Sequence, residues 1–290
     1  MFSSIYQLFV SIVLGIVQGI SEWLPISSKT QIILVSQYLL GLNFQQAYAF
    51  GLFMEIGTIL ASLIYFRKQV WVLIKVIIGR GSAGDWKLFK FVLVSTIVTG
   101  IIAVPLYVVV DSVSGGYNIG LPMIILGIVL FIDAILIWHS RSKYAINTNR
   151  KRLNQIGLKE YIMVGIAQGL AALPGVSRSG ATTSIMLLLN VEADEAFRLS
   201  FVDMIFATTA AVFVTLIFSK ASVAAALADV SLAGLVVAII IATAISLVLI
   251  NFLLNIAKKS KIIYLTAALG CIALAGGILI SLFPFTFAAG

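Results

Sequence analysis

Long, uninterrupted stretches of apolar residues dominate the pattern of hydrophobic and polar positions along this chain. Six of these stretches reach the roughly 20 residues that an α-helix needs to cross a bilayer. They cover residues 47–66, 91–110, 121–138, 196–218, 230–256 and 262–284. Because the apolar residues are continuous rather than alternating with polar ones, the pattern excludes a transmembrane β-barrel. It predicts an all-α polytopic membrane protein with six transmembrane helices.

Two further stretches, residues 5–42 and 159–191, begin as apolar helices but break at Pro25 and Pro174 into polar segments before they become apolar again. We expect each to form a re-entrant helical hairpin, which enters and leaves the membrane on one side. Non-helical backbone at membrane depth is tolerated only where it is buried in protein or lines a water-filled cavity. Two such hairpins therefore predict a cavity.

The positive charges fall mainly between the apolar stretches. Fifteen of the 19 Lys and Arg residues lie in three connections, 67–90, 139–160 and 257–261, whereas 111–120 and 219–229 carry only Lys220 between them. The positive-inside rule then places the first three connections in the cytoplasm and the other two outside. With this topology the first hairpin enters from outside and the second from the cytoplasm.

Composition agrees with a multi-pass membrane protein. Of the 290 residues, 61% are hydrophobic, the mean hydropathy is +1.13 and only 10% are charged, against about 25% in soluble domains. The net charge of +8 is explained by the cytoplasmic connections, so we expect the bilayer and no nucleic acid as a partner. The N-terminus lacks the basic region and small-residue cleavage site of a signal peptide.

The two hairpin stretches also resemble each other. Gly-Ile-Val-Gln-Gly-Ile at 15–20 recurs as Gly-Ile-Ala-Gln-Gly-Leu at 165–170, and a proline and two serines follow each copy. Each half then holds one hairpin and three spans, an odd number, so the second half must be inverted. We predict one integral membrane domain built as an inverted-topology repeat, with halves 1–145 and 146–290, whose broken segments form a site near the midplane.

Charged side chains inside a membrane cost about 2.5–3.5 kcal/mol each on insertion scales and are therefore functional candidates. In the first hairpin, Gln18 and Glu22 are four residues apart and share one helix face. Ser27 and Ser28 follow near the start of the next helix, a position that favours anions, and Lys29 stands beside them. The other intramembrane candidates are Glu55, Asp133, Arg178, Arg198 and Asp203.

The second hairpin carries an anion-binding pattern around Arg178. Its guanidinium is a planar fork that suits phosphate oxygens, and Gly180 allows a ligand to approach the backbone closely. Ser177, Ser179 and Thr182 add hydroxyl donors, and the positive end of the following helix points to the same place.

The purely structural alternative for the first hairpin is that Ser27 and Ser28 cap a helix and Glu22 pairs with Lys29 or Arg178. For the second hairpin it is that Arg178 pairs with Glu22 only to hold the two halves together.

The two segments resemble the signature motifs of the undecaprenyl-diphosphate phosphatase (bacitracin-resistance) family. One motif is Glu or Gln, three residues, Glu and a Pro-x-Ser-Ser turn; the other, Pro-Gly-x-Ser-Arg-Ser-x-x-Thr, is intact at 174–182. The resemblance implies hydrolysis of a C55-type polyprenyl diphosphate to the monophosphate, which recycles the lipid carrier of envelope glycan synthesis. It also implies a location in the plasma membrane, a site open to the outer face and a divalent cation, Mg²⁺ or Ca²⁺.

Residue by residue, the resemblance points to Gln18, Glu22, Ser27, Ser28, Ser177, Arg178 and Thr182. We expect Glu22, Ser27, Ser28 and Arg178 to be catalytic, and Glu22 with Gln18 to hold the cation. We expect the diphosphate to contact Gln18, Lys29, Ser177, Ser179, Gly180 and Thr182.

The chain departs from the family pattern at three places. Lys29-Thr30-Gln31 stands where the family has Thr-Gly-His, so the family histidine is absent, and His139, the only histidine, lies at the cytoplasmic end of a span. Glu22 is the candidate for the acid–base role. Glu55 replaces a usual glutamine and Asp203 an apolar residue; either could bind a cation or a proton. For Asp133 and Arg198 we expect structural pairs or interfacial positions.

Two mechanisms and one rival function stay open at this stage. Ser28 or Ser27 attacks the terminal phosphorus, with Glu22 as base or metal ligand, or Glu22 activates water directly. The rival is a lipid-phosphate or ion-coupled transporter, because inverted repeats with broken helices are also a transporter architecture. The sequence leaves homo-oligomerisation open as well.

Overall fold

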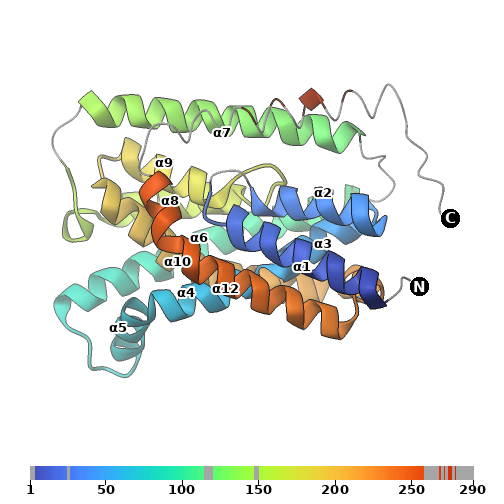
Figure 1. Ribbon diagram of the computed structural model, residues 1–290. Coiled ribbons are helices and arrows are strands. Elements are labelled where there is room, and N and C mark those ends of the chain that lie inside the picture. The colour runs from blue at the N-terminus through green and yellow to red at the C-terminus, as the bar shows by residue number, and fades with distance from the viewer. Residues whose placement is uncertain are drawn as a thin grey trace.

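A computed structural model of the protein describes residues 4–24, 27–113, 120–146 and 150–257, together with five single positions between 268 and 278. This part of the chain is helical, and its only β-type pairing is an isolated bridge between Lys151 and Val191. The long helices run side by side as a bundle (Figure 1). In chain order the helices are α1 (Ser4–Ser21), α2 (Ser28–Leu40), α3 (Phe44–Met54), α4 (Ile56–Tyr65), α5 (Arg67–Ile77), α6 (Ala83–Val113), α7 (Gly120–Ile146), the short 3₁₀ helix η1 (Leu153–Gln155), α8 (Leu158–Leu170), α9 (Arg178–Leu188), α10 (Ala193–Phe218), α11 (Lys220–Val230) and α12 (Leu232–Ala257).

Five helical units in the described residues are long and apolar enough to cross a membrane. Four correspond to predicted spans: α3 with α4, then α6, α10 and α12. The fifth is α1, which the sequence assigned to a re-entrant hairpin. Helix α7 covers the predicted span 121–138, and the last predicted span, 262–284, lies largely outside the described residues. The structure thus confirms an all-α protein with several membrane helices.

Each of the two stretches predicted as a hairpin contains two helices that pack on each other: α1 contacts α2, and α8 contacts α9. Helices α8 and α9 have 13 and 11 residues, or about 20 and 17 Å at 1.5 Å per residue, which is less than the roughly 30 Å hydrocarbon core. The turn before α9 uses Gly175 at φ 95°, where a residue with a Cβ would be strained.

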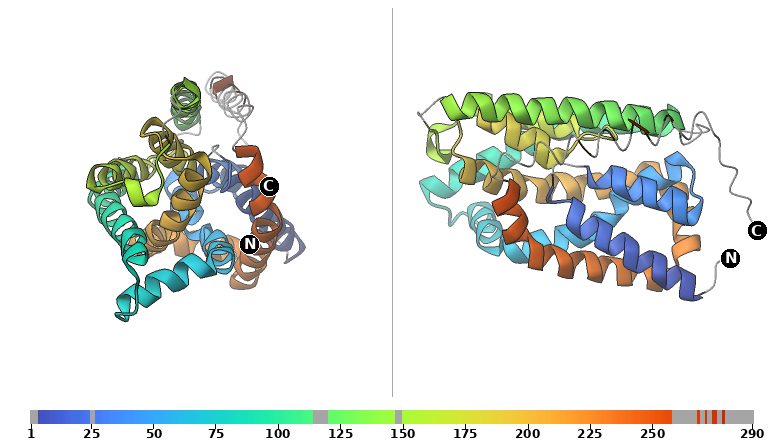
Figure 2. Two further views of the ribbon diagram at one scale, coloured as in Figure 1. Left: turned by 90° about the vertical axis from the view of Figure 1, so that its left-hand side faces the viewer. Right: turned by 45° about the horizontal axis from the view of Figure 1, so that its top comes forward.

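Each hairpin packs on a helix from the other half of the chain. Helix α1 lies along α12 and α8 lies along α6 (Figure 2). Both contacts involve the repeated glycines. A Cβ at Gly15 would lie 2.6 Å from the carbonyl oxygen of Ala238, and one at Gly165 would lie 2.7 Å from that of Ser95. The glycines therefore allow backbones to approach closely, as small residues do in membrane helix pairs.

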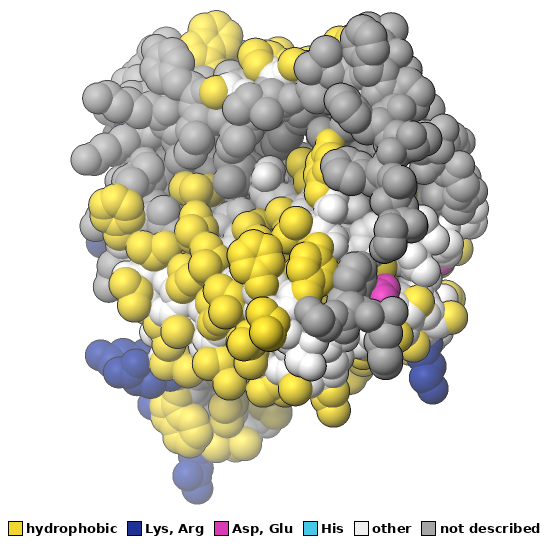
Figure 3. Space-filling view, turned by 45° about the vertical axis from the view of Figure 1, so that its right-hand side comes forward, with side chains coloured by type: hydrophobic (Ala, Val, Ile, Leu, Met, Phe, Trp, Pro, Cys, Tyr) yellow, Lys and Arg dark blue, Asp and Glu magenta, His cyan; other side chains and the backbone are white. Residues whose placement is uncertain are grey.

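The outer surface of the bundle is apolar. Large aliphatic side chains point outward, among them Ile101 on α6, Ile217 on α10 and Val248 on α12, each more than two-thirds exposed. Figure 3 shows hydrophobic side chains over much of the described face, with Lys and Arg at its margins. This distribution suits a helix bundle whose sides face lipid.

Candidate active site

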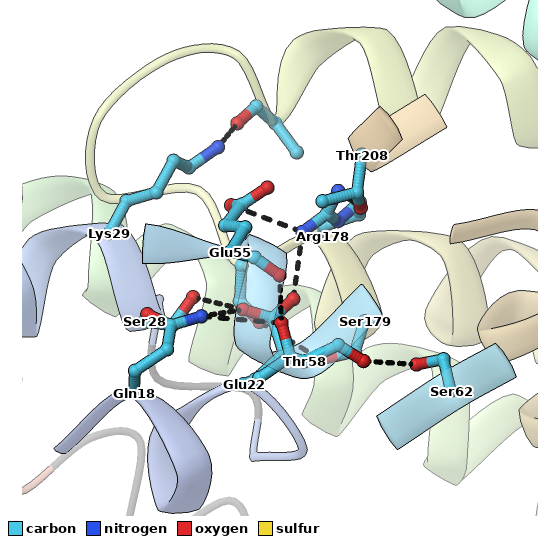
Figure 4. Close-up of polar contacts among 12 residues, drawn as sticks. Gln18, Glu22, Ser28, Lys29, Glu55, Thr58, Ser62, Arg178, Ser179 and Thr208 are labelled. Carbon is cyan, nitrogen blue, oxygen red and sulfur yellow. Dashed lines mark hydrogen bonds and ion pairs between the residues drawn. The ribbon is translucent and has the colours of Figure 1, made fainter. Parts of the chain in front are cut away.

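Arg178 joins the two hairpins and the break between α3 and α4. It is the first residue of α9, and its Nη2 lies 2.7 Å from Glu22 Oε1 and 3.2 Å from Glu55 Oε1. Its Nη1 donates to Thr208 Oγ1 on α10. These residues surround the guanidinium from different elements (Figure 4). The predicted proximity of Arg178 to the first hairpin is thus observed.

Glu22, just beyond the end of α1, is the second residue of the site that contacts several others. Its Oε2 accepts hydrogen bonds from Ser28 Oγ at 2.6 Å and from Gln18 Nε2 at 2.9 Å. Ser28 is the first residue of α2, and all three side chains are buried. A hydroxyl held against a carboxylate at this distance is the arrangement of a nucleophile with its base.

Three more of the predicted residues, Ser27, Ser177 and Thr182, have hydrogen-bond partners within the protein. Ser27, the N-cap of α2 at φ 56°, accepts from Thr30 Oγ1 at 2.9 Å. Ser177 caps α9 and accepts from the backbone N–H of Gly180 at 3.2 Å, so that N–H already has a partner. Thr182 lies one turn behind Arg178 and bonds the carbonyl oxygen of Arg178 and the hydroxyl of Ser200.

Two neighbouring spaces meet at Lys29 and Arg178. The smaller space is lined by polar residues of both hairpins; these are Glu22, Ser27, Ser28, Ser177 and Ser179. The larger space is lined by Glu55, Gln168 and mostly small or apolar residues of α3, α6 and α10. Polar and apolar compartments side by side match a ligand with an anionic head and an apolar body.

The site holds two buried charges of each sign. Glu22, Glu55, Lys29 and Arg178 are each no more than about a tenth exposed, and the Lys29 ammonium donates to the carbonyl oxygen of Ala171 at the end of α8. Removing one member of a buried pair leaves an uncompensated charge. The four formal charges sum to zero, which stabilises the site in the absence of a ligand.

The oxygens around Glu22 suit a hard divalent cation. Gln18 Oε1 and Glu55 Oε2 are buried and accept no hydrogen bond from the described residues, whereas Glu55 Oε1 is ion-paired with Arg178 at 3.2 Å. Carboxylate and amide oxygens are the ligands that Mg²⁺ and Ca²⁺ prefer. In the described part of the chain no three residues among His, Cys, Asp and Glu cluster as a metal site, so a cation here would also need ligand or water oxygens.

The remaining charged candidates and His139 lie outside this site. Arg198 pairs with Glu195 at 2.6 Å, as expected for a structural pair, and His139 is exposed near the end of α7. Asp203 is fully buried on α10. The side chain of Asp133 lies outside the described residues. Sequence reasoning missed Thr208, because nothing marks one threonine on an apolar helix as a partner of an arginine 30 residues away.

Fold and site together define a polytopic helical membrane protein with a buried ion-pair site between two broken helical segments. The family model described as bacitracin resistance protein BacA matches residues 11–275, and the chain belongs to this family. An undecaprenyl-diphosphatase of Saccharolobus solfataricus is 50% identical over 94% of this chain and 96% of the relative. Undecaprenyl-diphosphatases of Sulfurisphaera tokodaii and Pyrobaculum aerophilum are 43% and 38% identical, over 92% and 94% of this chain and 96% and 98% of the relatives.

Proposed function

We propose that this protein hydrolyses a polyprenyl diphosphate of the undecaprenyl type to the monophosphate and phosphate, and so recycles the lipid carrier of envelope glycan synthesis. The observation that carries the proposal is the contact chain Ser28–Glu22–Arg178, which joins a hydroxyl nucleophile, a carboxylate base and a phosphate-binding fork. The names of the relatives support the same activity. Neither supports a transporter in preference to an enzyme.

In this mechanism the smaller space receives the terminal phosphoryl group. Phosphoryl transfer depends mainly on positioning and charge stabilisation, which Arg178 supplies through its paired N–H donors. The Ser28 oxygen attacks phosphorus and its proton passes to Glu22. The bond from phosphorus to the bridging oxygen breaks, and the prenyl monophosphate leaves. Water then hydrolyses the phosphoserine. In the alternative, Glu22 activates a water molecule that attacks directly.

The two routes differ because only attack by Ser28 forms a covalent intermediate, a phosphoserine. A phosphoserine route predicts that Ser28→Ala abolishes turnover and that acid quenching of wild type with labelled substrate traps phosphate on the protein. Direct attack by water predicts neither.

We also propose that Glu22, Gln18 and Glu55 hold a divalent cation when substrate binds. The support is two buried oxygens that accept no hydrogen bond from the described residues, Gln18 Oε1 and Glu55 Oε2. A cation at this position supplies positive charge to phosphate oxygens. Calorimetric titration with Mg²⁺ or Ca²⁺ in the presence of prenyl monophosphate tests it, with Glu55→Gln expected to weaken binding.

For the membrane arrangement we propose six spans, two re-entrant hairpins and a site that opens to the outer face. The support is the sign pattern of the connections together with the shortness of α8 and α9. The larger space also reaches Tyr107 and Val214, which precede the two connections that the charges place outside.

The deciding experiment is phosphate release by the purified protein from C15, C20 and C55 prenyl diphosphates, with Arg178→Ala as the inactive control. We expect release by wild type that depends on Arg178. Binding of the lipid diphosphate without release would contradict the enzyme and favour the transporter.

A further inference from the structure

Asp203 is a buried charge that the proposed reaction does not use. It lies on α10, is fully buried, and accepts from Ser95 Oγ at 2.7 Å and from Gln168 Nε2 at 2.9 Å. Thr96 Oγ1 lies 3.5 Å from the same carboxylate oxygen as Ser95. These partners come from α6, which packs on α10, and from α8, which packs on α6 (Figure 1).

The surroundings of Asp203 repeat those of Glu22 with one omission. In the first hairpin, Gln18 Nε2 lies 2.9 Å from Glu22 and 3.5 Å from Thr58. In the second, the repeated glutamine, Gln168, lies 2.9 Å from Asp203 and 3.2 Å from Thr99. Glu22 is neutralised by Arg178, but Asp203 forms no ion pair with any Lys, Arg or His in the described residues.

A count of hydrogens shows that oxygen acceptors exceed donors around Asp203. Ser95 Oγ lies 2.6 Å from the carbonyl oxygen of Phe91, and Thr99 Oγ1 lies 3.2 Å from that of Gly165. Each hydroxyl has one hydrogen. Thr99 donates its hydrogen to Gly165 and accepts from Gln168, whereas the Phe91 carbonyl and the Asp203 carboxylate share the single hydrogen of Ser95. Gln168 Oε1 is also buried, and no described residue donates to it.

We propose that Asp203, Gln168, Ser95, Thr96 and Thr99 form a binding site for a monovalent cation such as Na⁺. An unpaired carboxylate in a membrane interior is costly, and one positive charge neutralises one carboxylate, whereas a divalent ion leaves an excess. Oxygen ligands suit a hard cation, and Na⁺ is the monovalent cation of this kind that the experiment uses. This inference does not depend on the proposed hydrolysis.

Part of the cluster borders a cavity. Thr96, Thr99 and Gln168 line the larger space that also contacts Glu55 and Arg178. Three of the five proposed ligand residues are therefore reached from this space.

The test is binding of radiolabelled Na⁺ to the purified protein in detergent, paired with thermal unfolding in NaCl or in choline chloride at equal ionic strength. We expect saturable binding near one ion per chain and a Tm that rises by several degrees with Na⁺ concentration, because a ligand of the folded state stabilises it. Asp203→Asn keeps the shape and removes the charge, so it abolishes both effects. Asp194→Asn removes an exposed carboxylate of the same helix and leaves both unchanged.

Gln168→Leu provides a second check, since loss of the amide oxygen weakens Na⁺ binding without changing the charge. A wild-type Tm that does not change with Na⁺ concentration at any pH, but falls as the pH rises, would mean that a proton neutralises Asp203. This result would overturn the proposal. A Na⁺ effect that persists in Asp203→Asn would place the ion elsewhere and would overturn it equally.

Discussion

At the scale of single residues, the site depends on geometry as much as on charge. Arg178 contacts Glu22, Glu55 and Thr208 at once, through two of its terminal nitrogens. A planar guanidinium makes such divergent contacts, whereas an ammonium is a single point of charge. A lysine at this position would therefore keep the charge but lose the divergent contacts.

Arg178→Lys is expected to lose about 10²-fold or more in turnover, the range for removing one preorganised donor to a transition state. Steady-state phosphate release with prenyl diphosphate measures the loss, and circular dichroism checks that the variant is folded. Near-normal turnover would show that the arginine is structural.

Glu22→Gln is expected to lower turnover by about 10²–10⁴, the usual effect of losing a general acid or base. Substrate binding changes less, because Arg178 remains. Gln31→His, which introduces the family's usual residue, leaves activity unchanged or raises it. The comparison includes the double variant. If Glu22→Gln matches wild type, Glu22 is neither base nor essential ligand; if only Gln31→His is active, this chain binds its lipid without hydrolysing it.

Lys29 and Glu55 both depart from the family pattern, and both line the larger space. Lys29→Thr alone leaves the buried carboxylates in excess and is expected to destabilise the protein by about 3–5 kcal/mol. The neutral pair Lys29→Thr with Glu55→Gln restores the balance and recovers most of that loss. A double-mutant cycle of unfolding free energies measures the coupling, and strictly additive effects would contradict it.

At the scale of elements, the hairpins are positioned by glycines that face a neighbouring helix. The contacts of α1 with α12 and of α8 with α6 both place a glycine where a Cβ would collide with backbone. The glycines of the repeated motif therefore pack helices together, whereas its glutamine donates a hydrogen bond to a buried carboxylate. Substituting a glycine tests the packing role by itself.

Gly165→Ala is expected to cost about 1–3 kcal/mol, because overpacking forces the backbones of α8 and α6 apart. Its added Cβ would lie 2.7 Å from both the Ser95 carbonyl oxygen and Val98 Cβ. Gly100→Ala is the matched control, since a Cβ there meets nothing within 4 Å. Thermal unfolding in detergent compares them; equal Tm values would contradict close packing at Gly165.

At the scale of the whole molecule, the arrangement of charges orients the protein in its membrane. Lys and Arg concentrate in connections that alternate with nearly uncharged ones, and the positive-inside rule converts this bias into a topology. The orientation decides whether the site takes lipid diphosphate from the outer or the cytoplasmic leaflet.

Cysteine accessibility tests the orientation. In a Cys271→Ser background, Ala221→Cys at the start of α11 is expected to react with a membrane-impermeant thiol reagent in intact cells. Ala83→Cys at the start of α6 reacts only after the cells are permeabilised, and both positions are exposed. The reverse pattern would place the site on the cytoplasmic face.

Much of this architecture is determined by the sequence alone, because it depends on local patterns. Continuous apolar runs specify membrane helices, prolines mark the two breaks, and a spacing of four residues puts Gln18 and Glu22 on one face. The sequence also indicated that Ser28 and Arg178 belong to one site. It did not predict that α1 is long enough to cross the membrane by itself.

Only the tertiary structure decided which distant groups meet. Glu55 and Thr208 reach Arg178, and Gln168 reaches Asp203, because α3, α8, α9 and α10 pack at particular angles and depths. No local pattern encodes such contacts, since they depend on the relative placement of helices that are far apart in the chain. Whether a buried acid pairs with an arginine, as Glu22 does, or lacks a cation, as Asp203 does in the described residues, is therefore a property of the assembled bundle.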